Sequence, residues 1–347
     1  MNLQFQSSRD MFPLALVLAI VVAFHGAKGV DGTSLKKVID APLLTEKIAT
    51  NRTIVVDING NGDYKSVQAA IDAIPEGNNE WIIVHVRKGI YREKVHIPKN
   101  KPYVFLRGNG KGRTSIFSSQ SSADNIESAT FKVEASNTVI FGISFKNMAP
   151  TGVVYTSQNQ SVAAFVAEDK IAFYHCGFFS SHNTLFDYKG RHFYESCYIQ
   201  GSIDFIFGRA RSSFHNCEIF VITDRRLPIH GSITAQNRAS AEEDSGYAFV
   251  KAEVYGTGEV YLGRAKGGYS RVVFAESYFS GTVTPQGWTN WSYDGSTENL
   301  YHAEYKCYGP GSGGDRAPWA KQLDDTEAAP FLSVDFISGK EWLPAWM

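Results

Sequence analysis

The chain contains little cysteine. Its 347 residues include only four, and no two of them form a C-x-x-C pair. Four thiols are too few for a fold built on disulfides, so the hydrophobic core has to carry the stability. The spacing of the cysteines also argues against a zinc site. An even count permits disulfides in an exported chain, so one bridged pair among Cys176, Cys197 and Cys217 stays an alternative to three buried thiols.

An excess of either charge is also absent. Lys and Arg number 34 and Asp and Glu number 35, which gives a formal net charge of −1. This balance excludes the strong overall field that draws proteins to nucleic acid or to an anionic surface. A polyanionic substrate would need basic residues that gather locally. We therefore predict neither a nucleic-acid partner nor a membrane partner.

Long hydrophobic runs are lacking except near the N-terminus. The apolar run at 11–24 is too short for a comfortable membrane span. Small residues follow it, so we predict a secretory signal peptide at 1–29, with an N-terminal membrane anchor as the alternative. In an exported protein the sequons become candidate glycosylation sites. They begin at Asn51, Asn159 and Asn290.

Three of the cysteines mark an internal repeat. They lie in the similar segments FYHCGF, YESCYI and FHNCEI, at spacings of 21 and 20 residues. Related segments at 139–145 and 273–279 are short, alternating and rich in aromatic and β-branched residues, which is typical of strands. Self-similar strands at this period predict a solenoid. Since little 3.6-residue periodicity separates them, we expect an all-β, right-handed parallel β-helix rather than a helix–strand repeat.

Stacked coils would place equivalent residues in ladders about 4.8 Å apart. The three cysteines and the aromatic residues beside them should then lie inside. A solenoid also needs covered ends. Apolar residues at helical spacing in 64–74, followed by Pro75, predict a short N-terminal capping helix. The stretch from about Gly309 lacks a strand period and should wrap the outside. We expect one domain over residues 30–347.

The most informative segment is 201–208, GSIDFIFG, which places a single carboxylate, Asp204, in an apolar run. The lost solvation of Asp204 has to be offset by a partner. Bracing of a sheet turn is the structural alternative. The segment resembles the signature of the pectin methylesterase family, in which this Asp is the nucleophile. The resemblance extends from about Ile54 to Trp346 and implies hydrolysis of galacturonate methyl esters in homogalacturonan.

Two further segments match that family. Segment 159–163, NQSVA, resembles its Gln-Ala-Val-Ala segment, which makes Gln160 the oxyanion donor. Segment 262–265, LGRA, resembles its Leu-Gly-Arg motif, which makes Arg264 the residue that orients the nucleophile and favours its ionised form. The resemblance implies covalent catalysis with neither metal nor cofactor. An inherited scaffold whose polar groups satisfy one another is the alternative.

The chain departs from the family at the proton donor. His182-Asn183 stands where the family has Gln-Asp, so Asn183 occupies the general-acid position. An amide cannot protonate methoxide and recover the proton from water at useful rates. The imidazole of an ordinary histidine has a pKa near 6.5, so His182 is a candidate relay, with a groove-lining role as the alternative. Lys266 replaces the family's Trp, and the loop at 123–127 lacks a Thr that many members carry.

Two functions follow from this pattern. The first is an active esterase with an altered proton relay and reduced activity, and the second is a catalytically inactive pectin-binding homologue. A lyase or galacturonase is disfavoured because no carboxylate cluster is visible around Asp204. Expected partners are pectin and a proteinaceous pectinesterase inhibitor. We expect a monomer, without an inhibitor-like pro-region, secreted to the cell wall.

Overall fold

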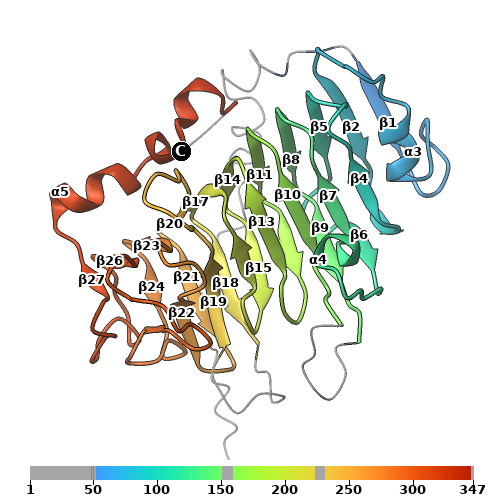
Figure 1. Ribbon diagram of the computed structural model, residues 1–347. Helices are drawn as coiled ribbons and strands as arrows, with labels where there is room; N and C mark the ends of the chain where they lie inside the picture. Colours follow the sequence, from blue (N-terminus) through green and yellow to red (C-terminus); the bar gives the residue numbers. More distant parts are fainter. Residues whose placement is uncertain (1–47, 49, 51, 151–158, 223–230, 345–347) are drawn as a thin grey trace, which may run out of the picture.

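Three parallel β-sheets form the body of the protein in a computed structural model (Figure 1). The structure describes residues 48, 50, 52–150, 159–222 and 231–344. The first sheet has eleven strands, and the second and third have eight each. Consecutive strands of the chain visit the three sheets in turn and then begin the next coil. This is the right-handed parallel β-helix that the repeat predicts.

The first sheet contains, in spatial order, β1 (Thr53–Val56), β2 (Ile82–Val86), β5 (Val104–Arg107), β8 (Thr138–Phe141), β11 (Ile171–Tyr174), β14 (Arg191–Glu195), β17 (Arg211–His215), β20 (Gly246–Val250), β23 (Arg271–Ala275), β26 (Tyr301–Tyr305) and β27 (Lys321–Gln322). The second contains β3 (Gly89–Arg92), β6 (Thr114–Ser118), β9 (Ser144–Asn147), β12 (Gly177–Phe179), β15 (Tyr198–Gly201), β18 (Glu218–Val221), β21 (Glu253–Gly256) and β24 (Tyr278–Phe279). The third contains β4 (Val95–Ile97), β7 (Phe131–Val133), β10 (Ala164–Ala167), β13 (Leu185–Lys189), β16 (Ile206–Gly208), β19 (Gly231–Gln236), β22 (Val260–Arg264) and β25 (Trp288–Thr289). The helices of the described residues are short: α3 (Val67–Asp72), α4 (Asn125–Ser128), α5 (Asp325–Ala328), η1 (Ala329–Phe331), η2 (Val334–Ile337) and η3 (Gly339–Glu341).

A one-residue turn explains the spacing of the cysteines. The residue before each of Cys176, Cys197 and Cys217 has a left-handed backbone with φ of 52°. This residue redirects the chain from the first sheet to the second and leaves the cysteine side chain inside. The Cys197 thiol, for example, donates to the carbonyl oxygen of Phe173 at 3.6 Å. All four cysteines lie in described ranges and are free thiols, so the alternative of a bridged pair is not realised.

The aromatic residues of the repeat stack inside the coils, as predicted. The ring of Tyr194 lies 5.1 Å from that of Phe173 and 4.5 Å from that of Phe214. Phe214 in turn stacks on Phe249 at 4.4 Å. All four side chains are fully buried. The ladder specifies the register between coils, because a one-residue slip would turn each ring to the outside.

A helix forms where the sequence predicts one near the N-terminal end. The Glu93 carboxylate accepts hydrogen bonds from the N–H groups of Val67 and Gln68 at the start of α3. Ala70 and Ile71 of this helix are buried in the main core. The helix contacts β1, β2 and β4, which places it beside the first coil (Figure 1). Its role as a cap stays a prediction.

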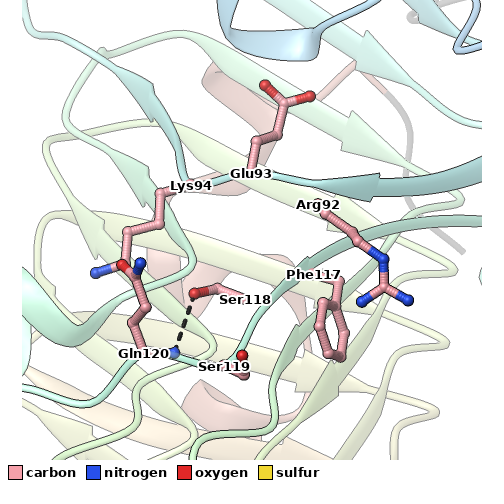
Figure 2. A pocket seen from close by; sticks show the side chains of 7 residues that line it. All are labelled: Arg92, Glu93, Lys94, Phe117, Ser118, Ser119 and Gln120. Atoms are coloured by element: carbon pink, nitrogen blue, oxygen red, sulfur yellow. Dashed lines mark hydrogen bonds between the residues drawn. The ribbon is translucent and has the colours of Figure 1, made fainter.

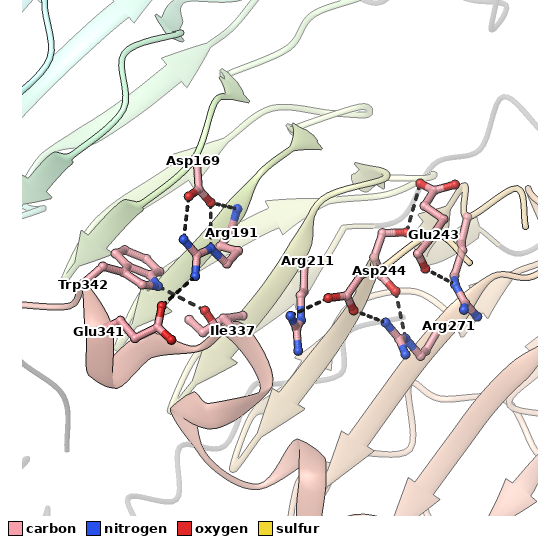
Figure 3. A network of polar contacts seen from close by, with 11 residues as sticks. Asp169, Arg191, Arg211, Glu243, Asp244, Arg271, Ile337, Glu341 and Trp342 are labelled. Atoms are coloured by element: carbon pink, nitrogen blue, oxygen red, sulfur yellow. Dashed lines mark hydrogen bonds and ion pairs between the residues drawn. The ribbon is translucent and has the colours of Figure 1, made fainter. Parts of the chain in front are cut away.

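The C-terminal segment packs on the outer face of the first sheet, as expected of a stretch that wraps the outside. Phe336 of η2 lies beneath the guanidinium groups of Arg211 and Arg271, at 5.3 and 5.5 Å. Both arginines also pair with Asp244 (Figure 3). Cation–π contacts and ion pairs thus join this segment to β17 and β23. The segment covers the first sheet, whereas the candidate site lies at the third.

Other expectations fall outside the described residues. The predicted signal peptide at 1–29 and the sequon at Asn51 both lie there. Across the ranges that are described, no helix is long and apolar enough to cross a membrane. The single domain over residues 30–347 stays a prediction.

Candidate active site

Asp204 lies in the tight turn between β15 and β16 and has a left-handed backbone with φ of 47°. The next residue, Phe205, is fully buried in the main core and anchors the turn. A Cβ added at Gly201 would lie 2.3 Å from Phe205, and one added at Gly208 would lie 2.1 Å from the carbonyl oxygen of Asp187. Both glycines of the segment are therefore required by close packing.

The Asp204 carboxylate is paired with the Arg264 guanidinium. Arg264 Nε lies 2.8 and 2.9 Å from the two carboxylate oxygens, and a terminal nitrogen lies 2.7 Å from Oδ2. Ser232 Oγ donates to Oδ1 at 2.6 Å. Asp204 is 8% exposed and Arg264 is 7% exposed, so the pair is largely removed from water. These charge-assisted bonds offset the desolvation of the carboxylate and hold its charged form in one orientation.

Ser232 is a contact of Asp204 that sequence reasoning missed. A Cβ added at Gly231 would lie 1.9 Å from the carbonyl oxygen of Ser202, so β19 begins directly against the turn that carries Asp204. This close approach brings the Ser232 hydroxyl to the carboxylate. No motif marks a serine 28 residues from its partner. Only the pairing of β16 with β19 reveals it.

Asn183 lies one coil before Asp204, in the turn between β12 and β13. Its side-chain NH₂ donates to Gln160 Oε1 at 2.5 Å and to Asn125 Oδ1 at 3.0 Å. Asn183 and Gln160 are both buried. Asn125 belongs to α4, within the loop that departs from the family pattern. Because Gln160 Oε1 accepts from Asn183, the NH₂ group of Gln160 faces away from it.

His182 is almost fully buried, with 1% of its surface exposed. Its Nε2 lies 3.1 Å from the carbonyl oxygen of Asn159. A carbonyl oxygen only accepts hydrogen bonds, so Nε2 carries a proton here, and a relay would have to use Nδ1. The ring is thus held against the segment that carries Gln160. The roles of all five predicted site residues, Gln160, His182, Asn183, Asp204 and Arg264, stay predictions.

Two more side chains lie near the Asp204–Arg264 pair. The ring of Trp291, 42% exposed, lies 5.3 Å from the Arg264 guanidinium, and sequence reasoning missed it. Lys266 reaches the surface two residues after Arg264. Desolvation of its amine and the charge of Arg264 lower the pKa of Lys266, while Asp204 raises it. The amine is therefore within electrostatic reach of Asp204, and it adds positive potential at the site.

A row of side chains on the outer face of the third sheet extends from the site toward the N-terminal coils. Phe207, three residues after Asp204, stacks on Phe186 at 4.4 Å, and Phe186 lies 5.2 Å from Phe165. Lys132 is the next residue in register. Phe186 and Phe207 are half-exposed and offer flat apolar surfaces to a sugar ring, whereas Phe165 is only 2% exposed. Within the described ranges, no three His, Cys, Asp or Glu side chains gather in a way that could hold a metal ion.

Known proteins resemble this chain in sequence and in fold. The Pectinesterase family model matches residues 53–340. The chain is 66% identical over 334 residues to probable pectinesterase 67 of Arabidopsis thaliana, across 96% of this chain and 97% of that protein. It is 39% identical over 311 residues to pectinesterase QRT1 of the same plant, across 85% and 80% of the two chains. Its structure resembles that of a pectin methylesterase from carrot, with 30% identity and a TM-score of 0.79 over 84% of this chain and 94% of that one. The chain belongs to the pectinesterase family.

Proposed function

We propose that this protein is a pectinesterase that hydrolyses the methyl esters of galacturonate residues in homogalacturonan. The observation that carries the proposal is the Asp204–Arg264 pair, a desolvated carboxylate in one fixed orientation at the edge of the third sheet. The half-exposed, stacked rings of Phe186 and Phe207 beside it support a sugar polymer as the substrate. Membership of the pectinesterase family supports the same reaction.

The proposed reaction has two covalent steps. A carboxylate oxygen of Asp204 attacks the ester carbonyl carbon, the bond to the methoxyl oxygen breaks, and methoxide leaves as methanol after it takes a proton. The galacturonate is then joined to Asp204 as an anhydride. Water attacks this anhydride and gives one proton to solvent, which restores the Asp204 carboxylate and releases galacturonic acid. The galacturonic acid then loses its own proton to solvent. Dividing the hydrolysis in this way replaces one difficult step by two easier ones.

Each neighbour of Asp204 has a proposed part in these steps. Arg264 and Ser232 hold the attacking carboxylate in position. The Asn183 side chain donates a hydrogen bond to Gln160 Oε1, and this contact turns the Gln160 NH₂ group away from Asn183. In our proposal this NH₂ donates to the oxyanion that forms when the carboxylate attacks.

No carboxylic acid occupies the position expected to supply the proton for methanol, because Asn183 stands there. We propose that the reaction draws this proton from water or from His182, and that it is therefore slow. A positioned general acid–base group contributes roughly 10²–10⁴-fold. The same substitution favours a second candidate function, a pectin-binding homologue without turnover. The two candidates differ only in whether methanol is released.

We further propose that the protein is secreted to the cell wall as a monomeric glycoprotein and that a proteinaceous inhibitor binds it. Support for secretion comes from the predicted signal at 1–29. Of the described sequons, Asn290 is exposed and suits a glycan. Asn159 is half-buried and its carbonyl contacts His182, so a glycan there would crowd the candidate site.

Methanol release from highly methylated pectin tests the main proposal. The purified protein is compared with its Asp204→Ala variant, and Asp315→Ala, which removes an exposed carboxyl elsewhere, serves as the control. We expect slow release by the parent and the control and none by Asp204→Ala. Unchanged release by Asp204→Ala would overturn the assigned nucleophile. Pectin binding without release by the parent would favour the second candidate.

A further inference from the structure

A row of aromatic side chains lies on the outer face of the second sheet, whereas the candidate site lies at the third. Its strands β15, β18, β21 and β24 follow one another along the β-helix (Figure 1). We call the outer row the one outward ring on each of these strands and the ring that bridges to β24: Tyr198, Phe220, Tyr255, Tyr278 and Tyr308. The first four are half-exposed, and Tyr308 is 57% exposed. Apolar side chains gathered on one face in this way indicate a binding surface.

The rings of the outer row contact one another across the strands. Tyr198 lies 6.2 Å from Phe220, and Phe220 lies 5.3 Å from Tyr255. Tyr278 lies 5.6 Å from Tyr308. Pairs of this kind also stabilise a sheet, which is the alternative that an experiment has to separate from binding.

One ring of the outer row lies directly against the backbone. A Cβ added at Gly309 would lie 2.8 Å from the ring of Tyr278. Only glycine permits this close approach. The C-terminal segment does not cover the row, because η2 packs on β14 and β17 of the first sheet.

The aromatic positions nearer the N-terminal end are occupied by cations instead. Phe117, Lys146 and Phe179 follow one another in register on the outer face. The Arg92 guanidinium lies 4.9 Å from the ring of Phe117 (Figure 2), and Lys146 Nζ lies 4.9 Å from that of Phe179. Each of these rings already has a cation–π partner. The rings left for a ligand therefore begin at Tyr198.

The charges beside the outer row are unfavourable for an anionic polymer. Glu218 and Glu253 are neighbours in register on β18 and β21, and Glu253 is exposed. Lys111 Nζ lies 3.4 Å from Glu218 Oε1, which compensates one of the two carboxylates. The Tyr255 hydroxyl donates to Glu218 Oε2 at 2.9 Å. A polymer of free galacturonate would be repelled by the remaining charge, so the outer row suits an uncharged ligand.

We propose that the outer row binds an uncharged β-linked glucan at a site that takes no part in ester hydrolysis. The hydroxyl groups of a β-glucose ring project around its rim, so both faces of the ring carry C–H bonds that pack on aromatic rings. The rim hydroxyls would meet the Tyr198 hydroxyl and the Gln200 amide, which lie 3.3 Å apart at the start of the row. The site holds the protein on a neutral polymer without any contribution from Asp204.

The test is calorimetric titration of the full chain with cellohexaose, an uncharged β-linked glucan. The row spans three strand spacings from β15 to β24, about 14 Å, so cellobiose should bind much more weakly. Tyr255→Leu and Tyr308→Ala should each weaken cellohexaose binding by about fivefold or more, because each removes a ring from the row. The control is Ile90→Ala, which removes a 55% exposed side chain from β3 of the same sheet. Its affinity should change by less than about twofold.

Further measurements separate binding from stability and from the proposed esterase. Tyr308 is exposed, so its variant should fold even if Tyr255→Leu does not, and urea unfolding of each variant records the stabilising part of the rings. Hexagalacturonate should not displace cellohexaose from the outer row. Methanol release from pectin should be the same in the parent and in Tyr308→Ala, so either proposal can fail without the other.

Three outcomes would overturn the proposal of a glucan site. The first is a parent that does not bind cellohexaose. The second is displacement by hexagalacturonate at equal concentration, which would make the row a further contact for the anionic polymer. The third is a parent that sediments as a dimer and a Tyr308→Ala variant that sediments as a monomer, which would make the row an interface between two copies of the chain.

Discussion

Asn183 and Asp204 occupy the same position on consecutive coils. Their φ angles are 51° and 47°, and the Asn183 N–H donates to the carbonyl oxygen of Ile203, the residue before Asp204, at 3.3 Å. Among residues with a side chain, Asn and Asp adopt this left-handed conformation most readily. Either residue therefore suits either turn. The replacement of the family's Asp by Asn183 therefore leaves the backbone unstrained.

We expect Asn183→Asp to raise methanol release at least tenfold. The new carboxyl would lie beside Asp204, and two neighbouring carboxylates raise the pKa of one of them, which suits an acid. The amides of Gln160 and Asn125 now accept from Asn183, and half a turn of each would present NH₂ groups to the carboxyl instead. The measurement is the initial rate of methanol release at several pH values.

Asn183→Ala is the matched control for that gain, because it removes the same two hydrogen bonds without supplying an acid. It should not raise the rate. If Asn183→Asp brings no gain while the parent is inactive, Lys266 and the altered loop at 123–127 become the cause of the lost activity.

Ser232→Ala should reduce kcat by on the order of tenfold, because a hydrogen bond to a charged group contributes about 1.5–3 kcal/mol.

Arg264→Ala should reduce kcat by on the order of 10²-fold or more. Arg264→Lys should not rescue the loss, since one amine cannot reproduce the paired contacts of Nε and the terminal nitrogen with Asp204. Steady-state rates with one methylated substrate test all three variants. A lysine variant at full activity would contradict the orienting role of the guanidinium.

His182→Gln should lower methanol release if the imidazole relays protons. We expect a loss of about threefold to tenfold, below the roughly 10²–10⁴-fold of a fully positioned acid–base group. Because a groove-lining ring also affects the rate, the deciding readout is the pH profile, which should lose its limb near the titration of histidine. A lower rate with an unchanged profile would assign His182 to the groove lining alone.

Glu195→Gln should change how stability depends on pH. Burial raises the pKa of Glu195 from 4.5 to about 7. As pH rises from about 4.5 to 7, the unfolded chain loses this proton while the folded protein keeps it, so the parent loses stability across this window. The glutamine variant lacks this loss. The free energy of unfolding of the variant, relative to that of the parent, should rise by roughly 1–3 kcal/mol between pH 4 and pH 8.

Urea unfolding at pH 4, 5.5 and 8 measures this difference. His215 lies beside Glu195 in register, and burial together with the charge of Lys251 lowers its pKa to about 4. Protonation of His215 destabilises the fold as pH falls below about 6.5, which is the opposite trend. Since both proteins retain His215, its effect cancels in the difference. Parallel stability curves for the two proteins would show that Glu195 titrates normally.

The fold was predictable because a β-helix repeats its chemistry along the chain. The coils around Cys176, Cys197 and Cys217 each have an aromatic residue inside, a left-handed residue at the turn and a small residue after it. These three features recur in the sequence at the period of the coil. The contacts of Asp204 were less predictable. Its pairing with Arg264 followed only from the family motif, since 60 residues separate the two.

The sequence by itself determined the period of the coils, the residues that stack inside them and the single carboxylate in the tight Gly201–Gly208 turn. These depend on local backbone geometry that recurs every coil, so they can be read along the chain. Only the tertiary structure decided that Ser232 and Trp291 join the Asp204–Arg264 pair and that Asn183 bonds Gln160 and Asn125. It also decided that the cysteines are free and that Tyr198, Phe220 and Tyr255 share one outer row. Such contacts depend on which coils pack together and how their side chains turn, and local sequence does not encode this.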